Sequence, residues 1–258
     1  MHFNNYYQPK SLEDAYRKLK ENEKNALIAG GLWMKKMDGS YDTLIDLSSL
    51  GLDKISEDKD YVRVGAMVSL RDFEVSPLVK SLNDGVASFA ISEVMGPAFR
   101  NQATIGGSIF GRYPFSDVVT GLLTLDVKLK LYPEREMSLE DYLNLRGRPD
   151  FIIIEILIKK EKCKSFYKKV KATALDFPLL NIAVSNRNGE LYIAVGSRPM
   201  VAALAHKAME AHKAGKSPEE VGEIAAQELS FASSNNISKE YRLDLCKVYV
   251  ARGIKEVL

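Results

Sequence analysis

The chain has 258 residues, of which 46% are hydrophobic, and its formal net charge is only +2. This length and composition suffice for a sizeable core, in one large domain or two small ones. Because lysine and arginine are spread along the chain, neither nucleic acid nor an anionic membrane is expected as a partner. The densest basic stretch, residues 159–171, is expected to be a solvated surface.

The N-terminus, cysteines and histidines lead us to expect a cytoplasmic protein without a metal site of its own. The first ten residues lack the apolar core of a secretory signal, and no apolar run approaches the length of a membrane span. Cys163 and Cys246 form no C-x-x-C pair and could not supply a four-thiolate cluster. His206 and His212 have a spacing that does not put them on one helix face as metal ligands.

The first 165 residues are predicted to mix strands and helices. Ser11 is expected to cap an amphipathic helix that runs to Asn22. Residues 26–29 read as a short buried strand that ends on Gly30-Gly31. The remaining elements expected before the second glycine pair are strands within 42–52 and 60–70, and a helical stretch over 69–94 that breaks near Pro77.

The second half is predicted to pass from strands to helices. A helix is expected over 116–126, followed by strands over 127–133 and 150–158. Asn188-Gly189 predicts the turn of a hairpin over 177–197. Helical patterns follow over 200–215, 217–230 and 238–258. From about residue 166 onward, the chain therefore has the α+β pattern of a hairpin sheet backed by helices.

Two glycine-pair loops, Ile28–Met34 and Thr104–Gly111, carry the main functional signal. Each follows apolar, strand-like residues, and the second pair is expected to lie inside a β-like run. A Gly-Gly pair lets backbone N–H groups converge on an anion, because no Cβ blocks the approach. Two such loops about 75 residues apart could clamp a diphosphate from both sides, or each could be a tight turn or bulge. An ordinary Rossmann site is not supported without G-x-G-x-x-G, and Arg112-Tyr113 stands where a P-loop requires Lys-Ser/Thr.

Three further residues are candidates with open alternatives. Asp117 could accept hydrogen bonds from sugar or ribityl hydroxyls, or it could cap a helix. Trp33, the single tryptophan, could stack on a ligand ring or lie in the core. Lys169 could neutralise a phosphate or a reduced ring, or lie on the surface. Neither a G-x-S-x-G elbow nor clustered histidines support a serine hydrolase.

At the second loop the chain resembles a known family. "FRNQATIGGSI" is similar to the "IRN-x-ATIGGN" signature of the flavoprotein subunit of molybdenum hydroxylases, a group that includes xanthine dehydrogenase and aerobic-type carbon monoxide dehydrogenase. Similar blocks occur in the same order along nearly the whole chain, among them "YYQPKSLEDAYRKL", "AGG", "VRVGAMVSLRDFE", "SDVVTGLLTLDVKLKLY", "KKVKATALDFPLLNIAV" and "EYRLDLCKVYVARGIKEV". Their number and order make the resemblance specific.

The resemblance implies a fold, a cofactor and partners. The fold is α+β: a PCMH-type (vanillyl-alcohol-oxidase-like) FAD-binding domain over 1–165, with α/β lobes of about 1–52 and 53–165, and a C-terminal α+β domain over 166–258. The implied role is that of an FAD-containing electron-transfer subunit that works with a molybdenum-cofactor subunit and a [2Fe-2S] subunit. Electrons would pass through FAD to NAD or another acceptor. A cofactor-poor scaffold subunit and a standalone FAD oxidoreductase are the alternatives.

By position, the resemblance also assigns cofactor contacts, with no catalytic or metal-ligating residue. They are Ile28, Ala29, Gly30, Gly31, Leu32, Trp33, Met34, Thr104, Gly106, Gly107, Ser108, Asp117, Ile152 and Lys169. In this reading the FAD diphosphate lies against Gly106-Gly107, and any Cβ there would collide with it. Asp117 matches a family aspartate that contacts the cofactor. Ile152 falls in a strand whose backbone approaches the flavin ring, and Lys169 matches a basic position near the ring edge.

The chain departs from the family pattern in both loops. The first loop usually reads "AGGTD" or "AGGHS", but here it reads "AGGLW". Because Leu32 cannot donate a hydroxyl hydrogen bond, the affinity for FAD is expected to fall by roughly 1 kcal/mol for each neutral hydrogen bond lost. Ser108 replaces the usual asparagine with a shorter polar side chain.

Overall fold

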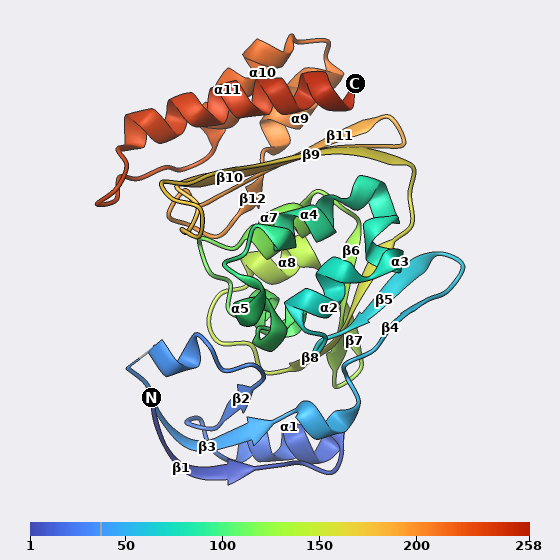
Figure 1. Cartoon of the computed structure of the whole chain (residues 1–258), viewed down its shortest axis with the longest axis vertical. Coiled ribbons are helices and arrows are strands. Elements are labelled where there is room, and N and C mark those ends of the chain that lie inside the picture. The colour runs from blue at the N-terminus through green and yellow to red at the C-terminus, as the bar shows by residue number, and fades with distance from the viewer. Residues whose placement is uncertain (37) are drawn as a thin grey trace.

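The computed structural model describes residues 1–36 and 38–258, which form three units in chain order (Figure 1). The N-terminal unit is a parallel three-stranded sheet in the order β1-β3-β2, with helix α1 packed on it. Its elements are β1 (His2–Tyr7), α1 (Leu12–Glu21), β2 (Ala26–Ile28), η1 (Met34–Lys36), β3 (Ser40–Asp46) and η2 (Ser48–Leu50). The Ser11 hydroxyl accepts a hydrogen bond from the Asp14 N–H, which confirms the predicted cap. Ala15 and Leu19 bury the apolar face of α1 against Ile45.

The middle unit is a five-stranded antiparallel sheet in the order β4-β5-β8-β6-β7, covered by short helices. Its strands are β4 (Ile55–Glu57), β5 (Tyr61–Gly65), β6 (Val127–Tyr132), β7 (Arg135–Ser138) and β8 (Ile152–Lys159). Its helices are α2 (Leu70–Val75), α3 (Pro77–Lys80), η3 (Leu82–Gly85), α4 (Val86–Ser92), α5 (Pro97–Gln102), α6 (Ile105–Phe110), α7 (Asp117–Leu123) and α8 (Leu139–Asn144). Pro77 occupies the first position of α3, where its missing N–H costs nothing, so the predicted break is confirmed.

The C-terminal unit is a four-stranded antiparallel sheet in the order β12-β11-β10-β9, and α9, α10 and α11 cover one of its faces (Figure 1). Its elements are β9 (Cys163–Val170), β10 (Leu180–Arg187), β11 (Glu190–Gly196), β12 (Ala203–Leu204), α9 (His206–Lys213), α10 (Pro218–Glu228) and α11 (Lys239–Val257). Asn188 and Gly189 both have positive φ, which confirms the predicted hairpin turn.

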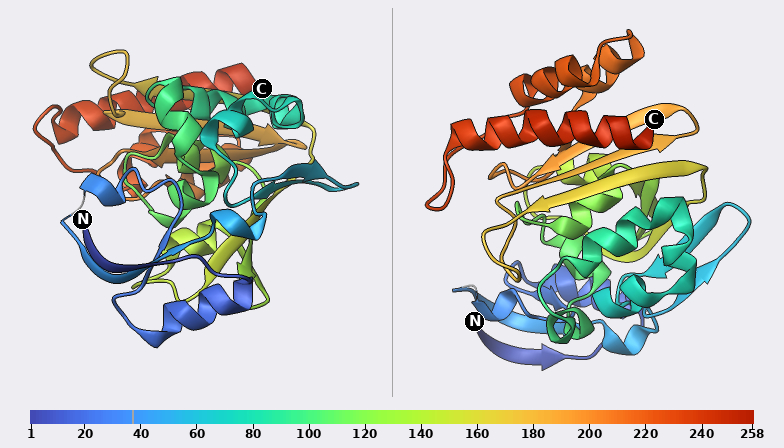
Figure 2. Two further views of the ribbon diagram at one scale, coloured as in Figure 1. Left: turned by 60° about the horizontal axis from the view of Figure 1, so that its bottom comes forward. Right: turned by 45° about the horizontal axis from the view of Figure 1, so that its top comes forward.

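The sheet of the C-terminal unit is buried on both faces. Ile182 and Val184 point into a core shared with α10 and α11. Ala183, between them on β10, belongs instead to the main core of the middle unit, together with Tyr167 and Ala194. The N-terminal unit and the C-terminal helices lie at opposite ends of the molecule (Figure 2). The domain boundary predicted at residue 165 falls within β9, and the division remains a prediction.

Three local predictions are wrong. The run around the second glycine pair is helical, because the Thr104 hydroxyl caps α6 by accepting from the Gly107 N–H. Residues 159–171 are not solvated throughout: β9 lies within them, and its alternating side chains expose Lys164 and Lys168 but bury Tyr167 and Lys169. The helix expected from residue 200 begins only at His206, because β12 first pairs with β11.

Two properties concern only the described residues. None of their helices combines the length and apolar character that crossing a bilayer requires. They also bring together no group of three or more His, Cys, Asp or Glu side chains that could hold a metal ion.

Candidate functional site

The first glycine loop contacts the end of α5, just before the second glycine loop, although the two segments are distant in sequence. The Gln102 amide Nε2 donates to the Gly30 carbonyl at 2.7 Å. A Cβ on Gly30 would lie 2.0 Å from the Gln102 carbonyl oxygen, so only glycine fits at this position. Gly31 has a φ of +67°, the left-handed conformation that favours glycine.

The second glycine pair has two different surroundings. A Cβ on Gly106 would meet the Cβ and carbonyl oxygen of Ala66, both at 2.6 Å. A Cβ on the exposed Gly107 would meet only the Thr104 hydroxyl, at 2.9 Å, and the Ala29 Cβ, at 3.8 Å. For Gly106, packing of the chain on itself is enough to exclude a side chain, and the predicted contact with a diphosphate remains a prediction. Gly107 is exposed, and the atom closest to its Cβ would be the Thr104 hydroxyl rather than backbone.

A cavity of ≈ 500 Å³ lies between the N-terminal and middle units. Such a volume falls in the range of cofactor and small-molecule sites. Of the residues assigned from sequence, those that line it are Ile28, Ala29, Gly30, Gly31, Leu32, Trp33, Met34, Thr104, Gly106, Gly107, Ser108 and Ile152. The fold thus gathers both loops and the first residue of β8 around one space.

The loops differ in the hydrogen bonds that their main chain can still make. In the second loop, the N–H of Ile105 donates to Val68, that of Gly106 to Ala66, and that of Gly107 to the Thr104 hydroxyl. In the first loop, the N–H groups of Gly30 to Trp33 meet no acceptor within the described part of the chain. The first loop therefore offers more unused donors to a ligand.

Asp117 and Lys169 lie outside this cavity and face each other beside a second, smaller pocket of ≈ 40 Å³. Lys169 Nζ donates to Asp117 Oδ2 at 3.0 Å and to the Glu93 carbonyl at 2.8 Å. Tyr167 and Asn181 donate to Asp117 Oδ1 at 2.6 and 3.0 Å. Asp117 is only 4% exposed. The helix cap is Ser116, whose hydroxyl accepts from the Val119 N–H, so Asp117 is free to serve as the centre of this network.

Burial governs the ionisation of the network. It raises the pKa of the Asp117 carboxyl above its usual range, although Lys169, Tyr167 and Asn181 all pull this pKa down. The pKa of Tyr167 is raised well above its usual value by burial and by the neighbouring carboxylate. Tyr167 and Asn181 carry no local sequence signal, because they reach Asp117 from strands β9 and β10.

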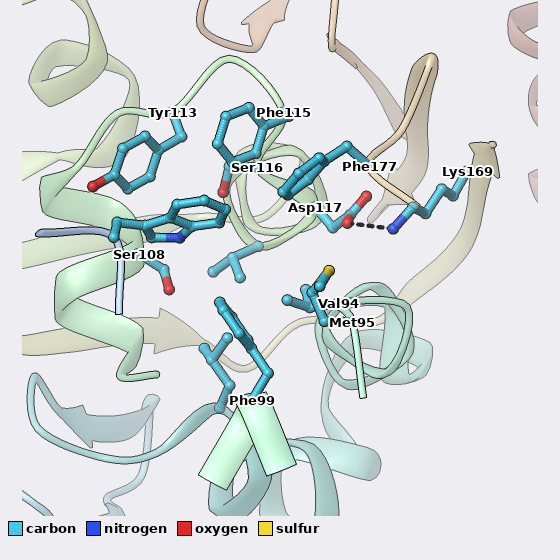
Figure 3. Close-up of a pocket in the computed structure, with 13 residues that line it drawn as sticks. Val94, Met95, Phe99, Ser108, Tyr113, Phe115, Ser116, Asp117, Lys169 and Phe177 are labelled. Atoms are coloured by element: carbon cyan, nitrogen blue, oxygen red, sulfur yellow. Dashed lines mark hydrogen bonds and ion pairs between the residues drawn. The ribbon is translucent and has the colours of Figure 1, made fainter. Parts of the chain in front are cut away.

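Aromatic side chains surround the smaller pocket. Figure 3 shows Tyr113, Phe115 and Phe177 on one side of it and Val94, Met95 and Phe99 on the other. The Trp33 ring lies 5.1 Å from that of Phe115 and 5.5 Å from those of Tyr113 and Phe177, between ring centroids. Trp33, Ser108 and Tyr113 line both spaces, so the half-buried tryptophan stands between them.

Comparisons with known proteins show which family the chain belongs to. The family described as "FAD binding domain in molybdopterin dehydrogenase" matches residues 1–159. The chain is 24% identical to the xanthine dehydrogenase FAD-binding subunit of Escherichia coli O157:H7, over 99% of this chain and 96% of that protein. It is 28% identical to the nicotine 6-hydroxylase medium subunit of Paenarthrobacter nicotinovorans, over 97% of this chain and 96% of that protein.

The fold matches solved structures along its full length. A chain of carbon monoxide dehydrogenase from Hydrogenophaga pseudoflava superposes with a TM-score of 0.88 and 23% identity, covering 100% of this chain and 97% of that one. A chain of quinoline 2-oxidoreductase from Pseudomonas putida 86 gives a TM-score of 0.85 and 20% identity, covering 98% and 96%. These two likenesses establish the α+β, PCMH-type fold. Because the family match spans more than half of the residues, this chain belongs to the FAD-binding domains of molybdopterin dehydrogenases.

Proposed function

We propose that the chain is the FAD-carrying electron-transfer subunit of a cytoplasmic, multi-subunit molybdenum hydroxylase. Its partners would be a subunit with the molybdenum cofactor and a subunit with [2Fe-2S] clusters. The observation that carries the proposal is that two glycine loops line one cavity of ≈ 500 Å³. Relatives over nearly the whole chain, which include a xanthine dehydrogenase FAD-binding subunit and a nicotine 6-hydroxylase medium subunit, support it.

The residues around the cavity fit a flavin dinucleotide. The unused N–H groups of the first loop suit the negative charge of a diphosphate, and Gly107 leaves its surface bare. The hydroxyls of Thr104 and Ser108 now bond within α6 and stand at the cavity wall, where they can exchange these bonds for a ligand. When bound, FAD would supply the redox chemistry, pairing single electrons into hydride for NAD or another acceptor.

The network around Asp117 would border the ring end of the site. The ion pair between the Asp117 carboxylate and the Lys169 ammonium fixes the position of both charges beside the pocket. Trp33 would separate this charge from the diphosphate end, because it lines both spaces. The chain's part in the reaction is then to bind, orient and exclude water.

The visible spectrum of the purified chain tests the proposal. We expect a yellow protein, or a colourless one that takes up stoichiometric FAD and acquires flavin absorption. Co-expression with candidate molybdenum and iron–sulfur subunits should yield a complex that reduces an acceptor. A colourless chain that cannot be reconstituted with FAD would contradict the proposal.

A cofactor-poor scaffold subunit is the second candidate, and the aromatic cluster favours it. Trp33 replaces a small polar residue of the usual loop and packs against Phe99, Tyr113, Phe115 and Phe177, which leaves only ≈ 40 Å³ beside Asp117. Gly107→Trp discriminates between the two. A flavin subunit should lose FAD and activity in the assembled complex, whereas a scaffold should assemble and work unchanged.

A further inference from the structure

Two arginines are the only charged side chains that line the ≈ 500 Å³ cavity among the described residues. Arg112 follows α6, and Arg148 lies in the segment between α8 and β8. No carboxylate shares the lining with them. The cavity therefore has a positive wall, which a neutral ligand would not require.

Both guanidiniums are held in place by neutral groups. Arg112 donates from Nη1 to the Leu145 carbonyl at 2.5 Å and from Nη2 to the Gly147 carbonyl at 2.7 Å. Arg148 donates to the carbonyls of Glu23 and Asn25 in the N-terminal unit. Main-chain carbonyls fix the position of a guanidinium but leave its charge uncompensated, and each guanidinium keeps further N–H donors.

The backbone of Arg112 is strained. Its φ is +45°, a region that non-glycine residues rarely occupy. Such strain persists where the surroundings hold it, and here the two carbonyl hydrogen bonds do so. The strained turn places Arg112 directly after the helix that carries the second glycine pair.

We infer that Arg112 and Arg148 bind the diphosphate of the dinucleotide and supply the charge that the glycine loops, with their neutral amides, cannot. The inference rests on the proposed function and goes beyond it, because it assigns the anion to two side chains of the cavity wall that lie outside both glycine pairs. Arginine hydrogen bonds to phosphate are charge-assisted, about twice as strong as neutral ones. The two arginines would also compensate for the hydroxyl hydrogen bond to FAD that Leu32 cannot donate.

The test compares ligands with and without phosphate on the full chain. Arg112→Met and Arg148→Met remove the charges while keeping chain length. Arg146→Met is the matched control, because Arg146 lies exposed in the same segment and does not line the cavity. FAD, ADP and riboflavin are titrated against each variant. We expect each cavity substitution to weaken FAD and ADP about tenfold or more, and to leave riboflavin unchanged. Arg146→Met should match the unsubstituted chain.

The unsubstituted chain gives a measurement that does not depend on variants folding. Raising the ionic strength should weaken FAD binding more steeply than riboflavin binding, because salt screens only the charged contact. If the cavity variants bind FAD as tightly as Arg146→Met does, or lose riboflavin equally, the arginine assignment is overturned while the flavin function stands. An unsubstituted chain that binds neither FAD nor ADP overturns the proposed function itself.

Discussion

The individual positions of the two glycine pairs require glycine for different physical reasons, although the pairs look alike in the sequence. Gly30 and Gly106 are required because the chain packs on itself, against Gln102 and Ala66. Gly31 is required by its positive φ. Gly107 is exposed on the cavity side, and a Cβ there would closely meet only the Thr104 hydroxyl. A glycine pair therefore marks a close approach without telling whether protein or ligand makes it.

Alanine at positions 106 and 107 should separate packing from binding. Gly106→Ala should lower the free energy of unfolding by about 1–3 kcal/mol, the usual cost of overpacking, because Ala66 cannot move away. Gly107→Ala should cost less, because its Cβ would press, at 2.9 Å, only on the Thr104 hydroxyl, and because alanine favours a helix. Its FAD affinity should nevertheless fall. Urea unfolding of the apo chain and FAD titration measure the two effects, and equal destabilisation by both substitutions would contradict this division.

The Asp117–Lys169 pair predicts a particular pH dependence. Lys169→Met should cost about 3 kcal/mol at neutral pH, because it leaves a buried carboxylate without its cation. Burial already raises the pKa of Asp117 above the unfolded value of about 3.9. Removing the ammonium raises it further. The folded state then keeps a proton that the unfolded state releases, so stability falls as pH rises between the two pKa values and is flat above them.

Urea unfolding across the acidic and neutral range checks this sign. The variant should be less destabilised in acid than at neutral pH. The double variant Lys169→Met/Asp117→Asn serves as the control. Its destabilisation should not depend on pH, because it has no carboxyl group at position 117. If Lys169→Met lowers the free energy of unfolding by the same amount at every pH, ionisation of Asp117 is not the cause of the loss.

At the scale of elements, a buried ion pair joins helices α2 and α5. Arg100 Nε and Nη2 donate to the Glu74 carboxylate at 2.7 and 3.3 Å, and Arg100 Nη1 donates to the carbonyls of Val94 and Met95. Burial alone would raise the pKa of Glu74, but hydrogen bonds from Arg71 and Arg100 outweigh it and hold this pKa below its usual range. The pair thus fixes the helix that leads into the second glycine loop.

Arg100→Met should destabilise the chain by about 3 kcal/mol at neutral pH. Because the Glu74 pKa is depressed in the folded state, its stabilising effect is present above the unfolded pKa of about 4.3 and is lost as pH falls through the folded value. The difference between variant and parent should therefore shrink in acid. Arg71→Met, at a partner that is 39% exposed, should cost less than about 1 kcal/mol. Thermal unfolding at neutral and acidic pH measures both variants. Equal destabilisation by the two substitutions, with the same pH dependence, would contradict the prediction.

Local chemistry explains which elements could be predicted from the sequence. The Ser11 cap and the Asn188-Gly189 turn depend on neighbouring residues alone, so both were predictable. The sequence predicts a strand in place of the helix after Thr104, because its isoleucines favour a strand and a threonine cap next to glycines is a weak signal. The site depends on more distant partners: Lys169 meets Asp117 across 52 positions of sequence, and Arg148 meets Asn25 across 123. No local pattern encodes such contacts.

For the whole molecule, the family match and the packing divide the chain differently. The match ends at residue 159, before β9 begins. The core of the middle unit nevertheless includes Tyr167, Ala183 and Ala194 of the C-terminal sheet. The Ser197 N–H also donates to the Pro114 carbonyl, in the loop before α7. The C-terminal unit thus shares the core of the middle unit, and its Lys169 and Phe177 line the smaller pocket.

A chain truncated to residues 1–162 should therefore fail to fold as an independent unit. It would lose the residues that cover α4 and α7, together with every side chain that hydrogen-bonds to the Asp117 carboxylate in the described structure. The apolar surface exposed would favour loose or associated states over a single packed one. We expect broad, non-cooperative thermal unfolding, binding of a hydrophobic dye, and FAD affinity well below that of the full chain. A sharp transition near the melting temperature of the full chain would instead mean that the middle unit completes its own core, and the boundary near residue 165 would then mark a true domain division.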